Sequence, residues 1–371
     1  MERRKPGLDW LITQMRIIGG VEKYASELAL ELSRRGWEIR LITLVEDSYL
    51  SRRLEQQGVP VISLGVKSKT DLSAWKRLEA LWQEKKPVIL HTHLFHAGIL
   101  GRLVGRKVGI PIILCHQGGP EHHRSLFRTL LDACTSHLVT RYIVPCGAVA
   151  SILNHRERIP SCKIDRIPNA IQPPPLELVR DSRKESTSPV RLVTVGRLVA
   201  EKAQWVMVRA VYMMAMRNLR PSLWILGEGP LRPKLQAQIQ QLNLTQLVSL
   251  LGFQDDPYPW LSQAHFFLLA SLWESLSLAL MEAMAMALPV IATATGGTPE
   301  LVSHLETGYL IPPNSPQALA EGIEFLLARP ELAQQMGEKA RKMILDHYTI
   351  PKVADQLEQY YQNLLEGLPL R

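Results

Sequence analysis

Hydrophobic residues in the first half of the chain fall into short, nearly continuous runs that alternate with longer segments of helical spacing. The runs are rich in β-branched residues, as in strands buried on both faces of a parallel sheet. A helical pattern spans residues 21–35 and ends at Gly36, where a helix stop is expected. Predicted strands lie at residues 8–13, 39–45, 59–64, 87–93, 110–116, 142–146 and 164–169. This alternation predicts an α/β domain built on a parallel sheet.

A change of composition interrupts the pattern at residues 172–190, where three prolines are followed by charged and small polar residues. Such a segment is typical of a connector between domains. The alternation then resumes, with predicted strands at residues 190–198, 222–229, 247–253, 265–271 and 289–293. We therefore expect one α/β domain over residues 1–172 and a second over 173–349. Residues 350–371 should contain an amphipathic helix that packs back towards the first domain.

The composition is that of a globular protein, since 46% of the 371 residues are hydrophobic and 21% are charged. No run reaches the roughly 18 to 20 uninterrupted apolar residues that a membrane-spanning helix needs, and the basic N-terminus lacks a secretory signal. Cys115, Cys134, Cys146 and Cys162 have no metal-binding spacing and are expected to be free thiols. We expect a cytoplasmic protein, or one bound peripherally to the cytosolic face of a membrane.

The net charge of +8 is unevenly distributed. Residues 1–172 contain 26 Lys and Arg against 16 Asp and Glu, together with eight of the eleven histidines. This excess favours an anionic membrane surface or a phosphate-bearing acceptor as the partner of the first domain. A solvated basic surface explains the charge equally well. Nucleic acid is not expected, because no recognition motif or aromatic-interleaved basic stripe is present.

One carboxylate, Glu282, lies in the segment 276–288, whose remaining residues are nearly all apolar. The pattern predicts a helix that is buried all round, where an ionised carboxylate needs specific donors such as sugar hydroxyls. Ser275 and Ser277 can cap this helix, and its free N–H groups suit a diphosphate. Glu274 stands just before its N-terminus. The alternative is that Glu282 pairs with a buried Arg or Lys.

Two cations follow a predicted strand in the second domain. Arg197 comes directly after Val195 and Gly196, and Lys202 lies five residues further on. Ligands of open α/β sheets bind beyond the carboxyl ends of the strands, so these cations could neutralise a diphosphate. Ordinary surface solvation would also explain them.

With these carboxylates and cations the chain resembles the retaining glycosyltransferases of family 4. Those enzymes have the GT-B fold, in which two Rossmann-like domains face each other across a cleft. The resemblance rests on GRLVAEK, ILGEGP, LLGF, the E-x7-E spacing of Glu274 and Glu282, PVIATATGG and PELV in the second half. In the first half it rests on IGGVEKYASELALELSRRG, ILHTH, ILCH and IPNAI. It thus covers nearly the whole chain, and it implies that the first domain binds the acceptor and the second the nucleotide sugar.

The resemblance also implies roles for individual residues. Arg197 and Lys202 would neutralise the donor diphosphate, Glu282 would hold the ribose hydroxyls, and Glu274 would contact the transferred sugar. His116 would lie near the reacting sugar, so the implied catalytic residues are His116, Arg197, Lys202 and Glu274. The implied donor-binding residues are Gly19, Gly20, Gly196, Arg197, Lys202, Gly252, Phe253, Glu274, Ser277, Leu278 and Glu282.

The activity implied is transfer of a hexose-type sugar from a nucleotide sugar to a hydroxyl of a lipid, glycan or small molecule. A UDP-sugar is the favoured donor and GDP-mannose the second choice. The resemblance implies retention of the anomeric configuration without a metal ion or other cofactor. The alternatives are a non-catalytic nucleotide-sugar-binding partner in a synthase complex, and a GT-B nucleotide-sugar hydrolase or epimerase.

Several positions depart from the family pattern. The usual Glu-Gly-Phe-Gly run is Glu-Ser-Leu-Ser at residues 274–277. The usual glycine after the lysine of the diphosphate site is Ala203, the glycine before LPVIA is Ala287, and a common proline is Ala270. These replacements are small, and they bear on loop geometry and donor-sugar specificity rather than on the fold.

The pattern HTHLFH invites a metal-binding interpretation, because a strand would place His91 and His93 on one face. No carboxylate or cysteine has a suitable spacing and the family needs no metal, so no metal site is predicted. The acceptor side is instead expected to include His93, His96, His122 and Arg124.

The helical segment at residues 71–86 has Leu72, Trp75, Leu78 and Trp82 on one face and basic residues elsewhere. Such a helix can lie on a membrane. Packing of the apolar face against the sheet is the favoured interpretation.

Overall fold

A computed structural model describes residues 5–15, 20–45, 49–66, 71, 73–119, 126–179 and 189–368. The chain forms two compact units. Unit 1 comprises Met1–Asn169 and Ile350–Arg371, and unit 2 comprises Ala170–Thr349. Each unit contains one sheet whose strand pairs are all parallel, with helices packed on it, so the predicted α/β fold class is confirmed.

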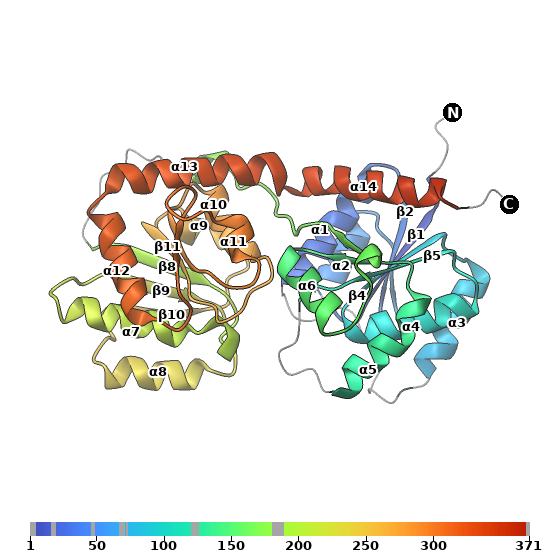
Figure 1. Cartoon of the computed structure of the whole chain (residues 1–371), viewed down its shortest axis with the longest axis horizontal. Helices are drawn as coiled ribbons and strands as arrows, with labels where there is room; N and C mark the ends of the chain where they lie inside the picture. Colours follow the sequence, from blue (N-terminus) through green and yellow to red (C-terminus); the bar gives the residue numbers. More distant parts are fainter. Residues whose placement is uncertain are drawn as a thin grey trace. The chain divides into compact units, whose positions relative to one another are not determined.

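The sheet of unit 1 has seven strands in the order β3-β2-β1-β4-β5-β6-β7 (Figure 1). They are β1 (Gly7–Ile12), β2 (Glu38–Thr43), β3 (Val61–Ser63), β4 (Ile89–His93), β5 (Ile112–His116), β6 (Arg141–Val144) and β7 (Ile164–Arg166). The helices are α1 (Gly20–Arg34), α2 (Tyr49–Gln56), α3 (Ser73–Glu84), α4 (Phe95–Lys107), α5 (Leu126–Thr135), α6 (Gly147–His155) and α14 (Ile350–Glu366). The strand order reverses between β1 and β4, and crevices at such reversals bind ligands in open α/β sheets.

Helix α14 is the last helix of the chain and packs on α1 of unit 1 (Figure 1). Its buried residue Tyr361 places its hydroxyl oxygen 2.6 Å from Nδ1 of His91 on β4. Tyr360 donates a hydrogen bond of 2.7 Å to Asp165 Oδ2 on β7. These contacts make the C-terminal helix an integral part of unit 1.

Helix α3 packs into unit 1 through its apolar face. Leu78 and Trp82 are fully buried in one hydrophobic cluster, and Trp82 Nε1 donates a hydrogen bond of 2.8 Å to Asp9 Oδ2 on β1. Burial raises the pKa of Asp9, while hydrogen bonds from Arg40 lower it. The packing interpretation of this helix is therefore confirmed, although Leu72 lies outside the described residues.

The sheet of unit 2 has six strands in the order β10-β9-β8-β11-β12-β13. They are β8 (Arg191–Val195), β9 (Ser222–Leu226), β10 (Val248–Gly252), β11 (Phe266–Leu269), β12 (Val290–Thr293) and β13 (Tyr309–Ile311). The helices are α7 (Gln204–Ala215), α8 (Arg232–Gln241), α9 (Tyr258–Leu261), α10 (Leu278–Ala285), α11 (Thr298–Leu301), α12 (Pro316–Leu327) and α13 (Pro330–His347). Here the strand order reverses between β8 and β11.

Helix α10 is shorter than the predicted helix over residues 276–288. Ser277 has an extended backbone and its hydroxyl accepts a hydrogen bond of 3.4 Å from Leu280 N, so it is the N-cap. Ala287 has a φ of 55°, in the left-handed region, which ends the helix. The apolar composition that suggested the longer helix reflects burial of the flanking turns.

Two of the alanines that replace family glycines have left-handed backbones. The φ angle is 46° at Ala203 and 55° at Ala287. Glycine adopts this conformation without steric cost, whereas a β-carbon adds roughly 1 to 2 kcal/mol. The substitutions therefore preserve the local backbone and strain it slightly.

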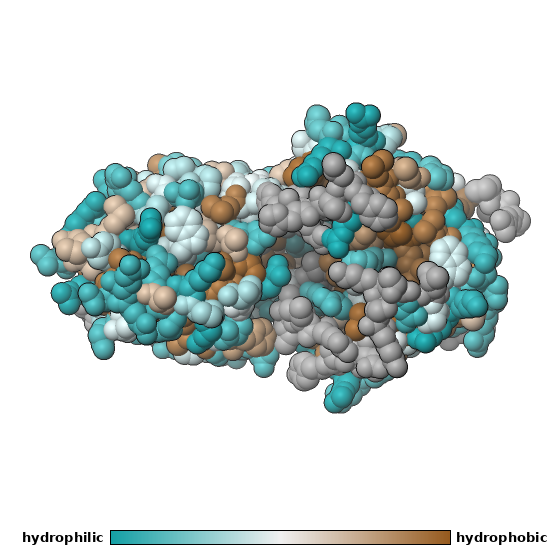
Figure 2. Space-filling view, turned by 90° about the horizontal axis from the view of Figure 1, so that it is seen from below, coloured by the Kyte–Doolittle hydropathy of each residue, from teal (hydrophilic) through white to brown (hydrophobic). Residues whose placement is uncertain are grey.

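Unit 1 exposes some apolar surface. Leu130 on α5 is 62% exposed, and Figure 2 shows hydrophobic side chains gathered on one face of this unit. Among the described helices, none combines the length and apolar character needed to cross a bilayer. Contact of this basic unit with an anionic membrane stays a prediction.

Candidate functional site

The loops that follow β8 and β11 bring Lys202 and Glu274 together at the reversal point of the unit 2 sheet. Lys202 ends a short 3-10 helix (Ala200–Lys202) beyond β8, and its ammonium group forms an ion pair with Glu274 Oε2 beyond β11. The hydroxyl of Ser271 donates a second hydrogen bond, of 3.2 Å, to the same oxygen. The two side chains are 21% and 12% exposed, so a ligand can still reach them.

Backbone hydrogen bonds hold these two loops in place. Leu272 N donates to Glu201 O at 2.8 Å, which joins the β11 loop directly to the β8 loop. The buried side chain of Gln204 donates a hydrogen bond of 2.9 Å to Arg197 O. Arg197 itself is exposed, and Gly196 lies against the aliphatic part of the Lys202 side chain. The predicted pair of cations is thus brought to one edge of the sheet.

Two glycines allow backbone segments to approach this site closely. A β-carbon on Gly296, which has a φ of 56°, would lie 1.7 Å from Glu274 O. A β-carbon on Gly227 would lie 2.0 Å from Gly196 O. Both distances exclude any side chain unless the backbone moves. The loop that carries Gly296 therefore packs closely against the loop that carries Glu274. The loop that carries Gly227 packs in the same way against the loop that carries Gly196.

Helix α10 places Glu282 inside unit 2, where the side chain is only 4% exposed. Tyr258 on α9 lies near it, since burial and then the charge of Glu282 raise the pKa of the Tyr258 phenol. The phenol donates a hydrogen bond of 2.9 Å to Gln172 O. Ser277 and Leu278 stand at the start of the same helix, as predicted for groups that meet a phosphate.

Two of the implied donor-binding residues, Gly252 and Phe253, lie at the end of β10. Gly252 has a φ of 76° and its carbonyl accepts a hydrogen bond of 2.7 Å from Gly227 N. Phe253 follows and is 46% exposed, which is unusual for a phenyl ring and leaves a face available for stacking.

In unit 1 three histidines cluster at the carboxyl ends of two adjacent strands. His93 on β4 pairs in register with His116 on β5, and His91 lies on the same face of β4. The rings stack, with centroids 4.6 Å apart for His91 and His93 and 5.0 Å apart for His93 and His116. Burial lowers the pKa of His116 to about 4 and holds the pKa values of His91 and His93 well below their usual range.

The other predicted residues of unit 1 are placed differently. Gly20 is the first residue of α1, while Gly19, His122 and Arg124 lie outside the described residues. His96 does not join the histidine cluster, because Leu94, with a φ of 70°, turns the chain from β4 into α4. His91 and His93 share one face of β4, as predicted, and the strand register places His116 beside them.

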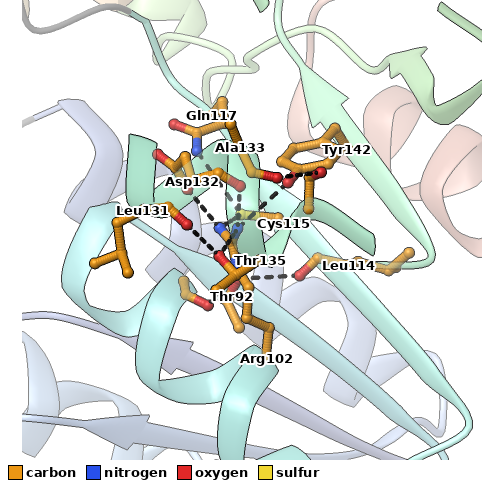
Figure 3. A network of polar contacts seen from close by, with 12 residues as sticks. Thr92, Arg102, Leu114, Cys115, Gln117, Leu131, Asp132, Ala133, Thr135 and Tyr142 are labelled. Atoms are coloured by element: carbon orange, nitrogen blue, oxygen red, sulfur yellow. Dashed lines mark hydrogen bonds and ion pairs between the residues drawn. The ribbon is translucent and has the colours of Figure 1, made fainter. Parts of the chain in front are cut away.

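A polar network surrounds Arg102 and Cys115 (Figure 3), and Cys115 lies on the opposite face of β5 from its neighbour His116. Arg102 on α4, which is 1% exposed, forms an ion pair of 2.8 Å with the buried Asp132 on α5. The guanidinium also donates to Thr135 Oγ1 at 3.1 Å and to the Tyr142 hydroxyl at 3.3 Å. Its Nη2 lies 3.4 Å from Cys115 Sγ. The network ties α5 to the strand that ends in His116.

Sequence reasoning assigned no role to Ser271, Gly227 or Gly296. Gly227 lies in the ILGEGP motif, within the strand predicted at residues 222–229, and Gly296 lies in the ATGG motif, three residues after the strand predicted at 289–293. A glycine in that position signals a close backbone approach, and this signal was available. The contact of Ser271 with Glu274 carries no comparable signal.

Two family models match the chain and together cover both units. Residues 177–343 match the model described as glycosyl transferases group 1. Residues 19–170 match the model described as a glycosyl transferase 4-like domain.

Characterised relatives align over nearly the whole chain. The alpha-D-kanosaminyltransferase of Streptomyces kanamyceticus is 23% identical over 91% of this chain and 98% of its own length. The N-acetyl-alpha-D-glucosaminyl L-malate synthase of Bacillus anthracis is 26% identical over 95% of this chain and 96% of its own length. The crystal structure of Anabaena HepE in complex with UDP-glucose is similar with a TM-score of 0.84 and 17% identity, over 96% of this chain and 100% of that one. This likeness confirms the GT-B fold.

Proposed function

The chain belongs to the glycosyl transferases group 1 family and is a glycosyltransferase, and we propose that it moves a hexose-type sugar from a nucleotide-sugar donor to a hydroxyl group. The single observation that carries the proposal is the contact of Lys202 with Glu274 at the reversal point of the unit 2 sheet. In this proposal Lys202 supplies a cation for the diphosphate, and Glu274 supplies a carboxylate that accepts hydrogen bonds from the sugar hydroxyls.

The proposed chemistry separates charge across the bond between sugar and diphosphate. Lys202 and Arg197 neutralise the leaving diphosphate, which is an electrostatic contribution made mainly in the transition state. Glu274 accepts hydrogen bonds from the sugar hydroxyls and keeps its contact with Ser271. Because its carboxylate is already engaged by Lys202, we assign it to sugar binding rather than to covalent attack. The acceptor hydroxyl then attacks the anomeric carbon from the face that the diphosphate leaves and passes its proton to an oxygen of the departing diphosphate, so the configuration is retained.

The donor proposed is a UDP-sugar, with GDP-mannose as the second choice. The similarity to HepE, whose structure holds UDP-glucose, supports this choice. Exposed Phe253 at the end of β10 offers a flat surface for a planar base.

A thermal-shift series with UDP-, GDP- and ADP-sugars tests the donor directly. A ligand that binds only the native state stabilises it by about 2.7 kcal/mol at one hundred times its Kd, so the correct donor class should raise Tm clearly. UDP-sugars should give the largest shift, and free UDP should give part of it. Equal or absent shifts with all three classes would contradict the donor assignment.

Turnover should survive removal of divalent metals. We expect full activity in EDTA, because the cations of the site are side chains of the protein. Nuclear magnetic resonance of the product should show the anomeric configuration of the donor. A strict metal requirement or an inverted product would rule out the mechanism. Release of free sugar without any acceptor would instead identify a hydrolase.

Glu282→Gln should raise the donor KM about tenfold and leave kcat nearly unchanged. The substitution keeps the volume of this buried side chain and weakens its hydrogen bonds to the ribose, which are made equally in ground and transition states. Glu321→Gln, an exposed carboxylate on α12, is the matched control and should have wild-type kinetics. A fall in kcat at constant KM would assign Glu282 to the chemical step instead.

A further inference from the structure

The three clustered histidines of unit 1 carry ring nitrogens that have no hydrogen-bond partner among the described residues. Within the described part of the chain, His91 Nε2, His116 Nδ1 and both ring nitrogens of His93 are buried without a hydrogen-bond partner. Orphaned buried nitrogens are costly, and a cluster of them points to a ligand that would satisfy them together.

The geometry of the cluster suits one small cation. The three residues can each offer a ring nitrogen, and these atoms lie within 4.8 Å of one another. Tetrahedral zinc with bonds of about 2.1 Å to nitrogen places its ligand atoms about 3.4 Å apart. Closing the remaining distance requires rotation of the His93 and His116 rings about χ2, which is a soft torsion. The register of β4 and β5 fixes the backbone of all three residues.

Tyr361 fixes the orientation of one of these rings. Its hydroxyl oxygen lies 2.6 Å from His91 Nδ1, which leaves Nε2 as the ring nitrogen available to a ligand. Histidines that bind metals commonly donate their second N–H to such a partner, which sets the tautomer that ligates. The phenol can accept this bond as well as donate one.

We propose that His91, His93 and His116 bind one transition-metal ion such as Zn²⁺, and that the bound ion inhibits sugar transfer by occupying His116. Imidazole nitrogens suit zinc, cobalt and copper and bind magnesium or calcium poorly. Cys115 points to the opposite face of β5, towards Arg102, and supplies no ligand. Inhibition rests on the proposed function, whereas the metal site itself does not.

Cobalt titration of the metal-stripped full chain tests the site. One equivalent of Co²⁺ should produce the visible absorption of four-coordinate cobalt, and Zn²⁺ should abolish it. His91→Gln and His93→Gln should each weaken binding at least a hundredfold, and Tyr361→Phe about tenfold. His137→Gln and His155→Gln change exposed histidines of the same unit and should bind as wild type does. Unchanged affinity in a folded His91→Gln protein would overturn the proposal.

X-ray absorption of the wild-type zinc complex decides the matter even if the buried variants fail to fold. The spectrum should show three imidazoles at about 2.0 to 2.1 Å from the metal. Fewer imidazoles, or a sulfur ligand, would reject this site. In the activity arm, one equivalent of Zn²⁺ should lower turnover at least tenfold and EDTA should restore it. If zinc binds without lowering turnover, the proposed inhibition is refuted and the metal site stands. If the enzyme proves inactive, the cobalt titration and the X-ray absorption spectrum still decide whether the metal site exists.

Discussion

Lys202→Ala is expected to lower kcat by a factor of about 100 to 1,000. Removing one preorganised charge that stabilises developing negative charge typically costs about 3 to 4 kcal/mol of transition-state stabilisation. The loss should be large here because the substitution also leaves Glu274, the partner of Lys202, facing the diphosphate without its counter-charge. Steady-state kinetics with saturating donor and acceptor measure the effect.

The matched control is Lys234→Ala, which removes an exposed lysine from α8 in the same unit. It should leave kcat within twofold of wild type. The Lys202→Ala protein should also melt near the wild-type temperature, since partly exposed ion pairs contribute at most about 1 kcal/mol to stability. If the Lys202→Ala protein kept a near-wild-type kcat, the assignment of the site to unit 2 would be wrong.

Arg102→Met is expected to lower the free energy of unfolding by about 3 to 5 kcal/mol, because it leaves Asp132 as a buried charge without its ion-pair partner. The double variant Arg102→Met/Asp132→Leu should regain most of this loss, since two apolar residues can replace a buried pair. Chemical denaturation, followed by circular dichroism, measures both.

Lys107→Ala provides the comparison on the same helix. Lys107 also forms an ion pair, with Glu79, but its side chain is 55% exposed, so its loss should cost less than about 1 kcal/mol. Equal costs for the two single variants would show that the pair of Arg102 with Asp132 is not an energetically buried one. If the double variant were as unstable as Arg102→Met, the loss of stability would come from lost packing and not from the unpaired charge of Asp132.

The architecture of each unit was predictable from the sequence because buried parallel strands leave a strong signal. The strand predicted at residues 39–45 is β2 (Glu38–Thr43), and the helix predicted at residues 21–35 is α1 (Gly20–Arg34). The helix over residues 276–288 was predicted too long, since hydrophobicity reports burial and cannot show where Ala287 turns left-handed. The ends of a helix depend on single backbone angles, whereas a hydrophobic pattern averages over many residues.

The site was predictable in its components and not in its contacts. Resemblance to the family selected both Lys202 and Glu274, but their ion pair depends on how two loops 72 residues apart fold back. The strand period predicted that His91 and His93 share a face, while strand pairing determines that His116 lies beside them. The network of Arg102 and Asp132 depends on the rotation of α4 against α5, which the sequence pattern does not determine.

Because α14 is built from the last residues of the chain, unit 1 is discontinuous and unit 2 is inserted within it. During synthesis, unit 2 has its whole sequence available before Tyr361 can reach His91. The long sequence separation of the contacts made by α14 raises the contact order of unit 1 and should slow its completion. Until α14 has been synthesised and docks, Tyr361 cannot contact His91. A chaperone would therefore meet a folded unit 2 and an incomplete unit 1 on the same nascent protein.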